Sequence, residues 1–559
     1  MAYGQDKRWE EPNEDVGEDQ TDLGPNDTAR LVSTMIAATK VASIPLPRKP
    51  WLDELARAYD LSKLRQRTDA ELILGVSDDP AQQLQRPVYF RPDTDGNIGI
   101  YGTGGSGKSA TLRTLAVAAA ITPQGGPVHV YGLDFAAGGL RMLETLPHVG
   151  SIISGDDSER IARLISRLRA IIDDRVPRYG EVRASTIGEY RKLANKPDEP
   201  RILLLVDGMS TFRTEYEYTG IGGIYQAFQQ IVSDGRQVGI HIALTADRPA
   251  SVSAGIGALI QRKVVLRLTD ENDYMLVDAP SDVLSAASPA GRAVVDQLET
   301  QIAILGGSVN VSEQSKAIDA LAESMRRNNV TPAPPIERLA DEILLADLQK
   351  QLPDVAVIGV ADDTLSPVTI DAAGVFMISG PPASGRTTSL ATFAQAARAA
   401  KPKTTLAYFG NPRSQIGSMD LWAKRSLTVE AAAELARELL PLAEKTASGS
   451  DHLTIVIEGI SDFLGTAADP DLTALIKAAK RNDHFVIAES ESSTMSQSWP
   501  LLMEVKAGRR GFALQPDPSE GDMLYRTSFP RSKRSDFPVG RGWLVQAGKV
   551  RKVQLALPK

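Results

Sequence analysis

The sequence of 559 residues contains no cysteine. A chain without thiols cannot form disulfide bonds or hold a metal ion through thiolates, so a disulfide-stapled domain and a zinc-finger type of site are both excluded. The absence fits a reducing compartment. We therefore expect the protein to be cytoplasmic.

Long hydrophobic runs are missing as well. Apolar stretches such as Ile202–Val206 and Ala116–Ile121 are far shorter than the roughly 18 to 20 residues that cross a bilayer. The residues that follow Met1 are rich in Asp and Glu, unlike the basic and then apolar start of a secretory signal. We expect a chain that does not span a membrane by itself.

Positive charge is in deficit. The 62 Lys and Arg residues are outnumbered by 70 Asp and Glu residues, which gives a net charge of −8 and a pI of about 5.4. Proteins that bind duplex DNA usually carry a basic excess, so nucleic acid is disfavoured as the main partner. The short basic stretch Arg526–Arg534 is interpreted as a solvated loop rather than as a nucleic-acid or lipid site.

The chain is too long for one ordinary core, and its 42% of apolar residues indicate a globular protein. An acidic stretch without apolar periodicity predicts a disordered tail or linker over residues 1–28. Lead-in helices and an extended segment follow over 29–69. We predict a first domain over 70–315, a connector over 316–350 and a second domain over 351–559.

Short β-rich runs alternate with helical segments through both halves of the chain, which predicts an α/β fold with a mostly parallel sheet and helices on both faces. The expected strands of the first half are Asn97–Tyr101, Val128–Leu133, Ile202–Asp207, Ile240–Thr245 and Val264–Leu268. Those of the second half are Val375–Ile378, Thr405–Tyr408, Leu453–Ile457 and Phe485–Ala488.

An internal repeat supports two copies of one domain type. The segment GNIGIYGTGGSGKSATLRTLAVAAA begins at Gly96, and AGVFMISGPPASGRTTSLATFAQAA begins at Ala373. Gly102 and Gly380 are equivalent positions in the two segments. Each begins a glycine-rich loop between an expected strand and an expected helix.

The first of these loops matches the phosphate-binding pattern GxxxxGK[ST] in full. Backbone amides and the helix N-terminus would hold phosphate oxygens, Lys108 would reach the terminal phosphates, and Ser109 would bind Mg²⁺. We predict ATP and Mg²⁺ as cofactors. The predicted nucleotide-binding residues are Gly102, Thr103, Gly104, Gly105, Ser106, Gly107, Lys108, Ser109 and Ala110.

A buried-type strand, RILLLVDG, ends in Asp207, the expected second group on the metal side beside Ser109. Motor ATPases usually carry a glutamate directly after this aspartate, but here Gly208 follows. Unless Asp134, Glu271 or a residue that the sequence does not reveal serves as the base, hydrolysis should be slow.

The second loop departs from the pattern because Arg386 stands where lysine is expected. A planar guanidinium is a poor replacement for an ammonium group inside a loop that wraps phosphates. The matching strand ends in Glu458, again followed by a glycine. We expect a degenerate site, whose candidate residues are Gly380, Ser384, Gly385, Arg386, Thr387, Thr388 and Glu458.

Several further segments resemble the FtsK/SpoIIIE-type P-loop motor ATPases and, more closely, the EccC coupling ATPase family of type VII (ESX) secretion systems. They are Leu133–Gly150, Gly235–Pro249, Val264–Tyr274, Ala290–Val295 and Gly511–Val545. The resemblance covers most of residues 40 to 559. It implies two tandem RecA/FtsK-like P-loop NTPase domains that correspond to the second and third ATPase domains of that family.

The resemblance also implies partners and roles. Small WXG100-type secreted proteins would be the substrates, a membrane-anchored motor subunit or domain of the same system would be a partner, and the chain would assemble into a ring or hexamer. It would lie at the inner face of the cell membrane through its partners.

Lys108, Asp207 and Thr245 are the candidate catalytic residues. Thr245 falls where the family keeps a polar sensor near the γ-phosphate, but it is also an ordinary strand residue. Arg236, Arg262 and Arg267 are candidates for an arginine finger by position only, with a surface ion pair as the alternative for each. A DNA translocase and a regulatory scaffold with little hydrolysis remain the alternative functions.

Overall fold

The computed structural model describes residues 26–45, 52–65, 68–122, 124–217, 223–532 and 534–558. The first 25 residues, which hold most of the predicted acidic tail, lie outside the described residues. Of the described residues, those up to Glu54 together with Pro80–Leu84 form one unit, and the others form a second unit. In the first unit, helix α1 (Asp27–Val41) is capped by the Asn26 side chain, which accepts a hydrogen bond from the amide of Ala29.

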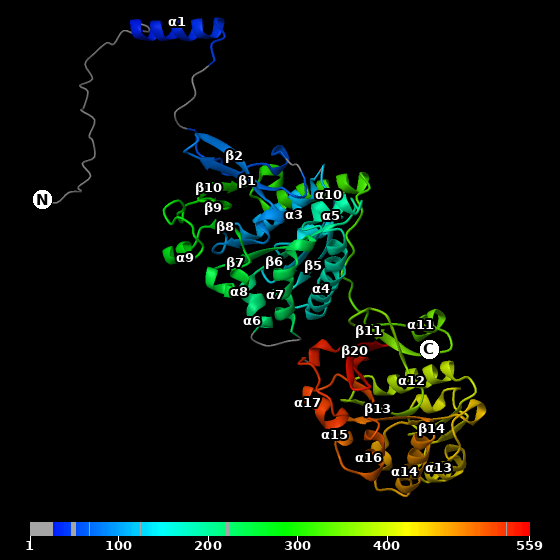
Figure 1. Cartoon of the computed structure of the whole chain (residues 1–559). Helices are drawn as coiled ribbons and strands as arrows, with labels where there is room; N and C mark the ends of the chain where they lie inside the picture. The colour runs from blue at the N-terminus through cyan, green and yellow to red at the C-terminus, as the bar shows by residue number, and fades with distance from the viewer. Residues whose placement is uncertain are drawn as a thin grey trace, which may run out of the picture. The chain divides into compact units, whose positions relative to one another are not determined.

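The chain forms two ten-stranded sheets with the same strand order. Figure 1 labels strands and helices of both sheets in chain order. The order in the first is β2-β1-β10-β9-β8-β3-β7-β6-β4-β5, and the second repeats it with every strand number raised by ten. The internal repeat of the sequence is thus a repeat of topology. The predicted α/β class, with two tandem P-loop domains, is confirmed, and we retain 70–315 and 351–559 as their proposed limits.

The first sheet comprises β1 (Leu72–Asp79), β2 (Leu84–Phe90), β3 (Ile98–Tyr101), β4 (Val128–Asp134), β5 (Val149–Ser154), β6 (Arg201–Asp207), β7 (Ile240–Ala246), β8 (Arg262–Leu266), β9 (Arg292–Val295) and β10 (Leu298–Ile302). Its helices are α2 (Pro92–Asp95), α3 (Lys108–Ala120), α4 (Ser158–Glu181), α5 (Ile187–Leu193), α6 (Met209–Tyr216), α7 (Ile224–Asp234), α8 (Ala254–Gly257), α9 (Glu271–Leu276) and α10 (Val311–Arg327).

After α11 (Leu345–Gln351), the second sheet comprises β11 (Ala356–Ala361), β12 (Pro367–Ile370), β13 (Gly374–Gly380), β14 (Thr405–Phe409), β15 (Lys424–Ser426), β16 (Leu453–Ile457), β17 (Phe485–Glu491), β18 (Gly511–Leu514), β19 (Arg541–Gln546) and β20 (Lys549–Leu555). Its helices are α12 (Arg386–Ala400), α13 (Val429–Ala443), α14 (Asp469–Arg481), α15 (Ser492–Met495), α16 (Pro500–Lys506) and α17 (Pro518–Glu520).

Strand β6 shows why each sheet is covered on both faces. Its side chains alternate in direction, so Ile202, Leu204 and Val206 join the cluster that packs under α4, α6 and α7. Leu203 and Leu205 join the cluster under α3 and α10 on the opposite face. A strand buried on both faces has a continuous apolar sequence, as RILLLV does.

Each sheet is parallel from β8 to β5, or from β18 to β15 in the second copy. The strands beyond β8 and β18 are antiparallel, and the sequence did not reveal this part. Of the segment expected to hold lead-in helices, residues 52–56 have no regular structure, and the next helical turn after α1 is at Leu61–Lys63.

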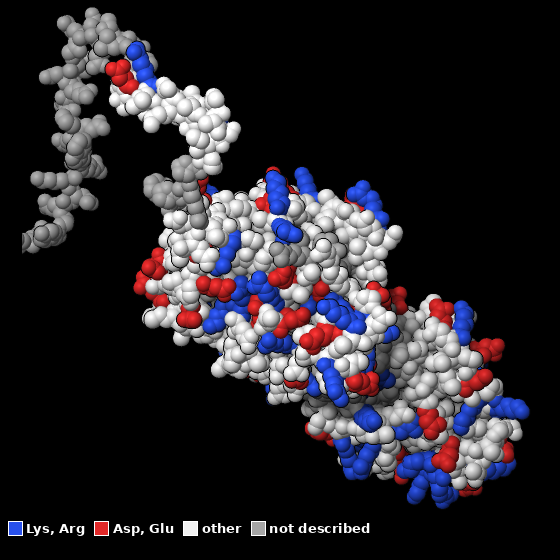
Figure 2. Space-filling model, turned by 45° about the horizontal axis from the view of Figure 1, so that its top comes forward, with Lys and Arg blue, Asp and Glu red and all other residues white. Residues whose placement is uncertain are grey.

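Charged side chains of both signs are scattered over the face shown in Figure 2. On the face shown in Figure 2, Lys and Arg side chains alternate with Asp and Glu side chains across much of the described surface, rather than forming one basic band. Within the described residues, no helix combines the length and the apolar character that a membrane span requires.

His148 lies buried directly before β5, and His129 on β4 is partly buried. Burial lowers the pKa of His148 to about 4, although the Nε2–H donated to the carbonyl of Ala116 opposes the shift. Burial also lowers the pKa of His129 to about 4, with Arg175 and Arg167 adding to the effect. The unfolded chain therefore takes up protons between pH 6.5 and 4 that the folded chain does not.

We expect the free energy of unfolding to decrease as the pH falls from about 6.5 to about 4. His148 alone should contribute a loss of about 2 kcal/mol between pH 7.5 and pH 5. Urea unfolding followed by circular dichroism at the two pH values measures this loss. His148→Met should make the pH-dependent loss smaller by about 2 kcal/mol. The control Ser77→Ala, which removes a buried hydroxyl, should lower the free energy of unfolding equally at both pH values. A pH-dependent loss that is unchanged in His148→Met would contradict the assignment.

Candidate nucleotide-binding site

The first glycine-rich loop connects the end of β3 to the start of α3. The amide of Gly102 donates to the carbonyl of Ala246 (3.1 Å), and the amide of Thr103 donates to that of Arg267 (3.0 Å), so neighbouring strands hold the loop. Gly107 has a φ of +114°, and a Cβ at this position would lie 2.8 Å from the amide nitrogen of Gly291. The loop therefore requires glycine here, and the chain closes into a cradle at the N-terminus of α3.

Lys108 lies across the mouth of the cradle. Its Nζ donates to the carbonyl oxygens of Gly102 (2.7 Å) and Thr103 (2.9 Å) and pairs with the Asp247 carboxylate at 2.8 Å. The Asp247 side chain is 66% exposed, so this carboxylate can move away without a burial cost. The exposed Asp247 carboxylate thus holds the Lys108 ammonium group beside the loop, in a position where another anion could replace the carboxylate.

The predicted metal-side residues lie together. Ser109 Oγ donates to Asp207 Oδ2 at 2.6 Å, and Thr245 Oγ1 donates to Asp207 Oδ1 at 2.6 Å. Thr245 in turn accepts the amide of Gly208 at 2.9 Å. A serine hydroxyl and a carboxylate at the start of a phosphate-binding helix are suitable donors for Mg²⁺, which prefers oxygen ligands and keeps several waters. The described residues therefore fit the ion.

The glycine after Asp207 has a structural reason. Gly208 has a φ of +92°, and a Cβ at this position would lie 3.2 Å from the backbone of Phe135. A glutamate in this place would have to adopt a left-handed backbone that side chains disfavour. The missing catalytic base thus follows from the backbone conformation that begins α6.

Asp134 and Glu271, the alternative candidates for the catalytic base, lie in different surroundings. Asp134 lies beside Asp207 in the sheet, but its two carboxylate oxygens accept the amides of Ala136 (3.1 Å) and Leu140 (3.0 Å). Glu271 is exposed at the start of α9. Asp247, which the sequence reading did not select, is the carboxylate that contacts Lys108; its position one residue after β7 is the signal that could have found it.

The three arginine candidates are separated. Arg236 donates to the carbonyls of Asp93 and Thr94, and Arg262 forms an ion pair with Asp296. Arg267 donates to the carbonyl of Ser288 (3.0 Å) and to that of Gly105 in the loop (3.3 Å). Of the three, Arg267 is the one that contacts the glycine-rich loop of its own chain.

The second loop repeats the backbone of the first. Ser384 Oγ donates to the carbonyl of Pro381 at 2.8 Å, as Ser106 Oγ does to that of Thr103 at 2.8 Å, and Gly385 has a φ of +98° at the start of α12. The charged groups differ. Arg386 faces the carboxylates of Glu489 and Glu491, and Glu458 accepts a hydrogen bond from the Tyr408 hydroxyl.

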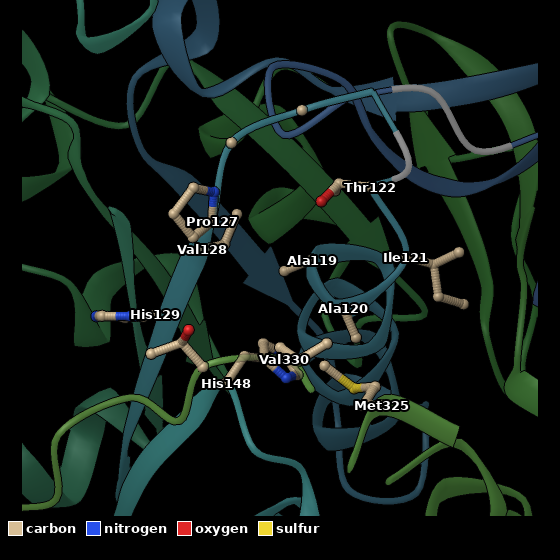
Figure 3. Close-up of a pocket in the computed structure, with 13 residues that line it drawn as sticks. Ala119, Ala120, Ile121, Thr122, Pro127, Val128, His129, His148, Met325 and Val330 are labelled. Carbon is tan, nitrogen blue, oxygen red and sulfur yellow. The ribbon is translucent and has the colours of Figure 1, made fainter. Parts of the chain in front are cut away.

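Two hollows lie at opposite ends of α3. A small one of about 90 Å³ adjoins the loop at Gly107 and Ala110 and is bounded mainly by apolar groups, including Gly291, Val309 and Val311. A larger one of about 340 Å³ lies by the C-terminal end of the helix, where Figure 3 shows Ala119, Pro127, His148 and Met325 around it. Its position away from the glycine-rich loop excludes it from the phosphate site.

Comparison with known proteins shows which sequences the chain resembles. The sequence model of the FtsK/SpoIIIE family matches residues 62–294. The ESX-1 secretion system protein EccCb1 of Mycobacterium tuberculosis is 28% identical over 323 residues, which cover 55% of this chain and 53% of that protein. The ESX secretion system protein EccC of Thermomonospora curvata is 28% identical over 354 residues, 58% of this chain and 26% of that protein. The chain thus matches about half the length of the first relative and a quarter of the second.

Solved structures agree on the fold. ATPases 2 and 3 of Thermomonospora curvata EccC, solved with a signal sequence peptide, superpose with a TM-score of 0.70 at 22% identity over 93% of this chain and 98% of that one. ATPases 2 and 3 of Geobacillus thermodenitrificans EssC superpose with a TM-score of 0.65 at 18% identity over 92% of this chain and 100% of that one.

The matched family is one of P-loop ATPases, and such a family implies nucleotide binding. Residues 62–294 match the FtsK/SpoIIIE family model, and the chain is similar in sequence to EccC and EssC proteins of type VII (ESX) secretion systems.

Proposed function

We propose that this chain is an ATP-binding coupling component of a type VII (ESX) secretion system. In this proposal its first domain binds ATP–Mg²⁺, and the chain helps to recognise WXG100-type secreted proteins for export. The observation that carries the proposal is the hydrogen-bonded group of Ser109, Asp207 and Thr245 beside the loop that contains Lys108.

The roles of the residues follow from their positions. Loop amides from Gly102 to Ala110 would surround the phosphates, Lys108 would exchange Asp247 for a phosphate oxygen, and Ser109 and Asp207 would hold Mg²⁺, which supplies positive charge against the phosphates. Thr245 would position Asp207. The apolar hollow of about 90 Å³ beside Ala110 suits the planar ring of a base.

Hydrolysis should be slow on its own. The described residues offer no glutamate after Asp207, and both oxygens of Asp134 are engaged by amides. We propose that ATP chiefly orders the first domain and that a partner subunit or a neighbouring copy in a ring raises turnover. The chain would lie at the inner face of the membrane through those partners, with the second domain serving mainly for docking.

Nucleotide binding tests the ranking of the two loops. Lys108→Ala should weaken the affinity for a fluorescent ATP analogue by at least about 100-fold, because the phosphates lose their cation. The matched change Arg386→Ala should alter the affinity less than about twofold. Fluorescence titration with Mg²⁺ measures both, and a larger effect of Arg386→Ala would reverse the assignment.

Partner binding distinguishes the proposal from a DNA translocase. We expect the chain to retain the C-terminal peptide of a WXG100-type protein in a pulldown and to show no band shift with duplex DNA at 150 mM salt, about physiological strength. A salt-sensitive band shift without peptide retention would favour the translocase.

A further inference from the structure

The two loops differ most at one buried position next to them. In the first sheet Thr245 pairs with Ile100, two residues before Gly102. In the second sheet Glu489 pairs with Ile378, two residues before Gly380. The sheet register therefore makes Thr245 and Glu489 equivalent. A neutral hydroxyl in the first cradle is replaced by a carboxylate in the second.

Glu489 also takes over one contact of the threonine, the one with the glycine amide. Gly459 follows Glu458 as Gly208 follows Asp207, and its amide donates to Glu489 Oε1 at 2.6 Å, as that of Gly208 does to Thr245. The Glu489 side chain is 7% exposed, and its Oε2 is buried without a hydrogen-bond donor. Among the described residues, the cation that pairs with Oε2 is the guanidinium of Arg386, whose Nη1 lies 3.4 Å away.

Arg386, the cation of the second loop, is thus already paired with carboxylates. Arg386 Nη2 also lies 3.6 Å from Glu491, whose side chain is 46% exposed. Glu491 is the counterpart of Asp247, the exposed carboxylate that stores Lys108 in the first loop. An acid at that position is therefore common to both loops, whereas the buried carboxylate of Glu489 has no counterpart in the first loop.

We propose that Glu489 closes the second loop to nucleotide by acting as a built-in anion, which holds Arg386 where a terminal phosphate would otherwise be bound. A triphosphate entering this cradle would meet a buried carboxylate that cannot move into water, and it would have to remove that carboxylate's only cation. The second domain would then keep its loop in one form whether or not ATP is present.

The burial of Glu489 is consistent with this arrangement. Burial raises its pKa above the ordinary value, while Arg386 and the amide of Gly459 favour the ionised form. Arg386 alone does not explain closure, because arginine keeps the positive charge that phosphates need. The proposal therefore predicts that Arg386→Lys by itself does not open the loop.

The test uses the full chain with Lys108→Ala, so that nucleotide binding at the first loop does not contribute to the signal. The combination Arg386→Lys with Glu489→Thr should gain saturable binding of one fluorescent ATP–Mg²⁺ per chain, at least about tenfold tighter than Lys108→Ala alone. The matched control, Arg386→Lys with Glu491→Thr, should gain nothing, because it leaves the buried carboxylate in place. Circular dichroism checks that each variant is folded, and Arg386→Lys with Glu489→Gln replaces the threonine version if that version unfolds.

Three results would overturn the proposal. The first is ATP–Mg²⁺ binding to the Lys108→Ala chain that a change in the second loop abolishes. The second is a gain of binding in the Glu491 control that equals the gain in the Glu489 variant. The third is no gain of binding in the Glu489 variants although they are folded. The proposal uses the proposed function only in treating the first loop as a nucleotide site. If the first loop is not a nucleotide site, the chain with Lys108 intact will bind no ATP–Mg²⁺. The second-loop variants can still be compared with their control in that case.

Discussion

The Asp207 carboxylate is the constraint around which the first site is arranged. It is buried, and its two oxygens accept hydroxyl hydrogen bonds from Ser109 on α3 and Thr245 on β7. Three elements that are far apart in the sequence therefore meet at one charged group. An unpaired carboxylate at this depth would cost free energy. The two hydrogen bonds to Asp207 are therefore retained, and they fix the positions of Ser109 and Thr245 beside the loop.

The same architecture in the second sheet carries different charges. Glu458 accepts from Tyr408, Glu489 stands where Thr245 would be, and Arg386 faces the buried carboxylate. Gly459 keeps the left-handed backbone of Gly208, with a φ of +59°. The second sheet thus preserves the backbone of the loop but places an ion pair between Arg386 and Glu489 beside it.

The sequence predicted the parallel part of each sheet and the first loop because these parts have local signals. RILLLVD is a continuous apolar strand that ends in a carboxylate, and the GxxxxGK[ST] loop is contiguous. The antiparallel strands lack such a signal: Leu84–Phe90 contains a proline and is only partly buried. Asp247 and Glu489 were missed because their significance depends on sheet register, which places residues more than a hundred positions apart side by side. The site residues that were predicted remain predictions of function, although the structure brings Lys108, Ser109, Asp207 and Thr245 together.

A crystal structure of the chain grown with Mg²⁺ and a non-hydrolysable ATP analogue tests the central claim most directly. The account predicts a triphosphate in the first loop, with Lys108 Nζ moved from Asp247 to a phosphate oxygen and the Ser109 hydroxyl released from Asp207. It predicts no nucleotide in the second loop, where Arg386 should still face Glu489. A triphosphate in the second loop with the first loop empty would contradict the account.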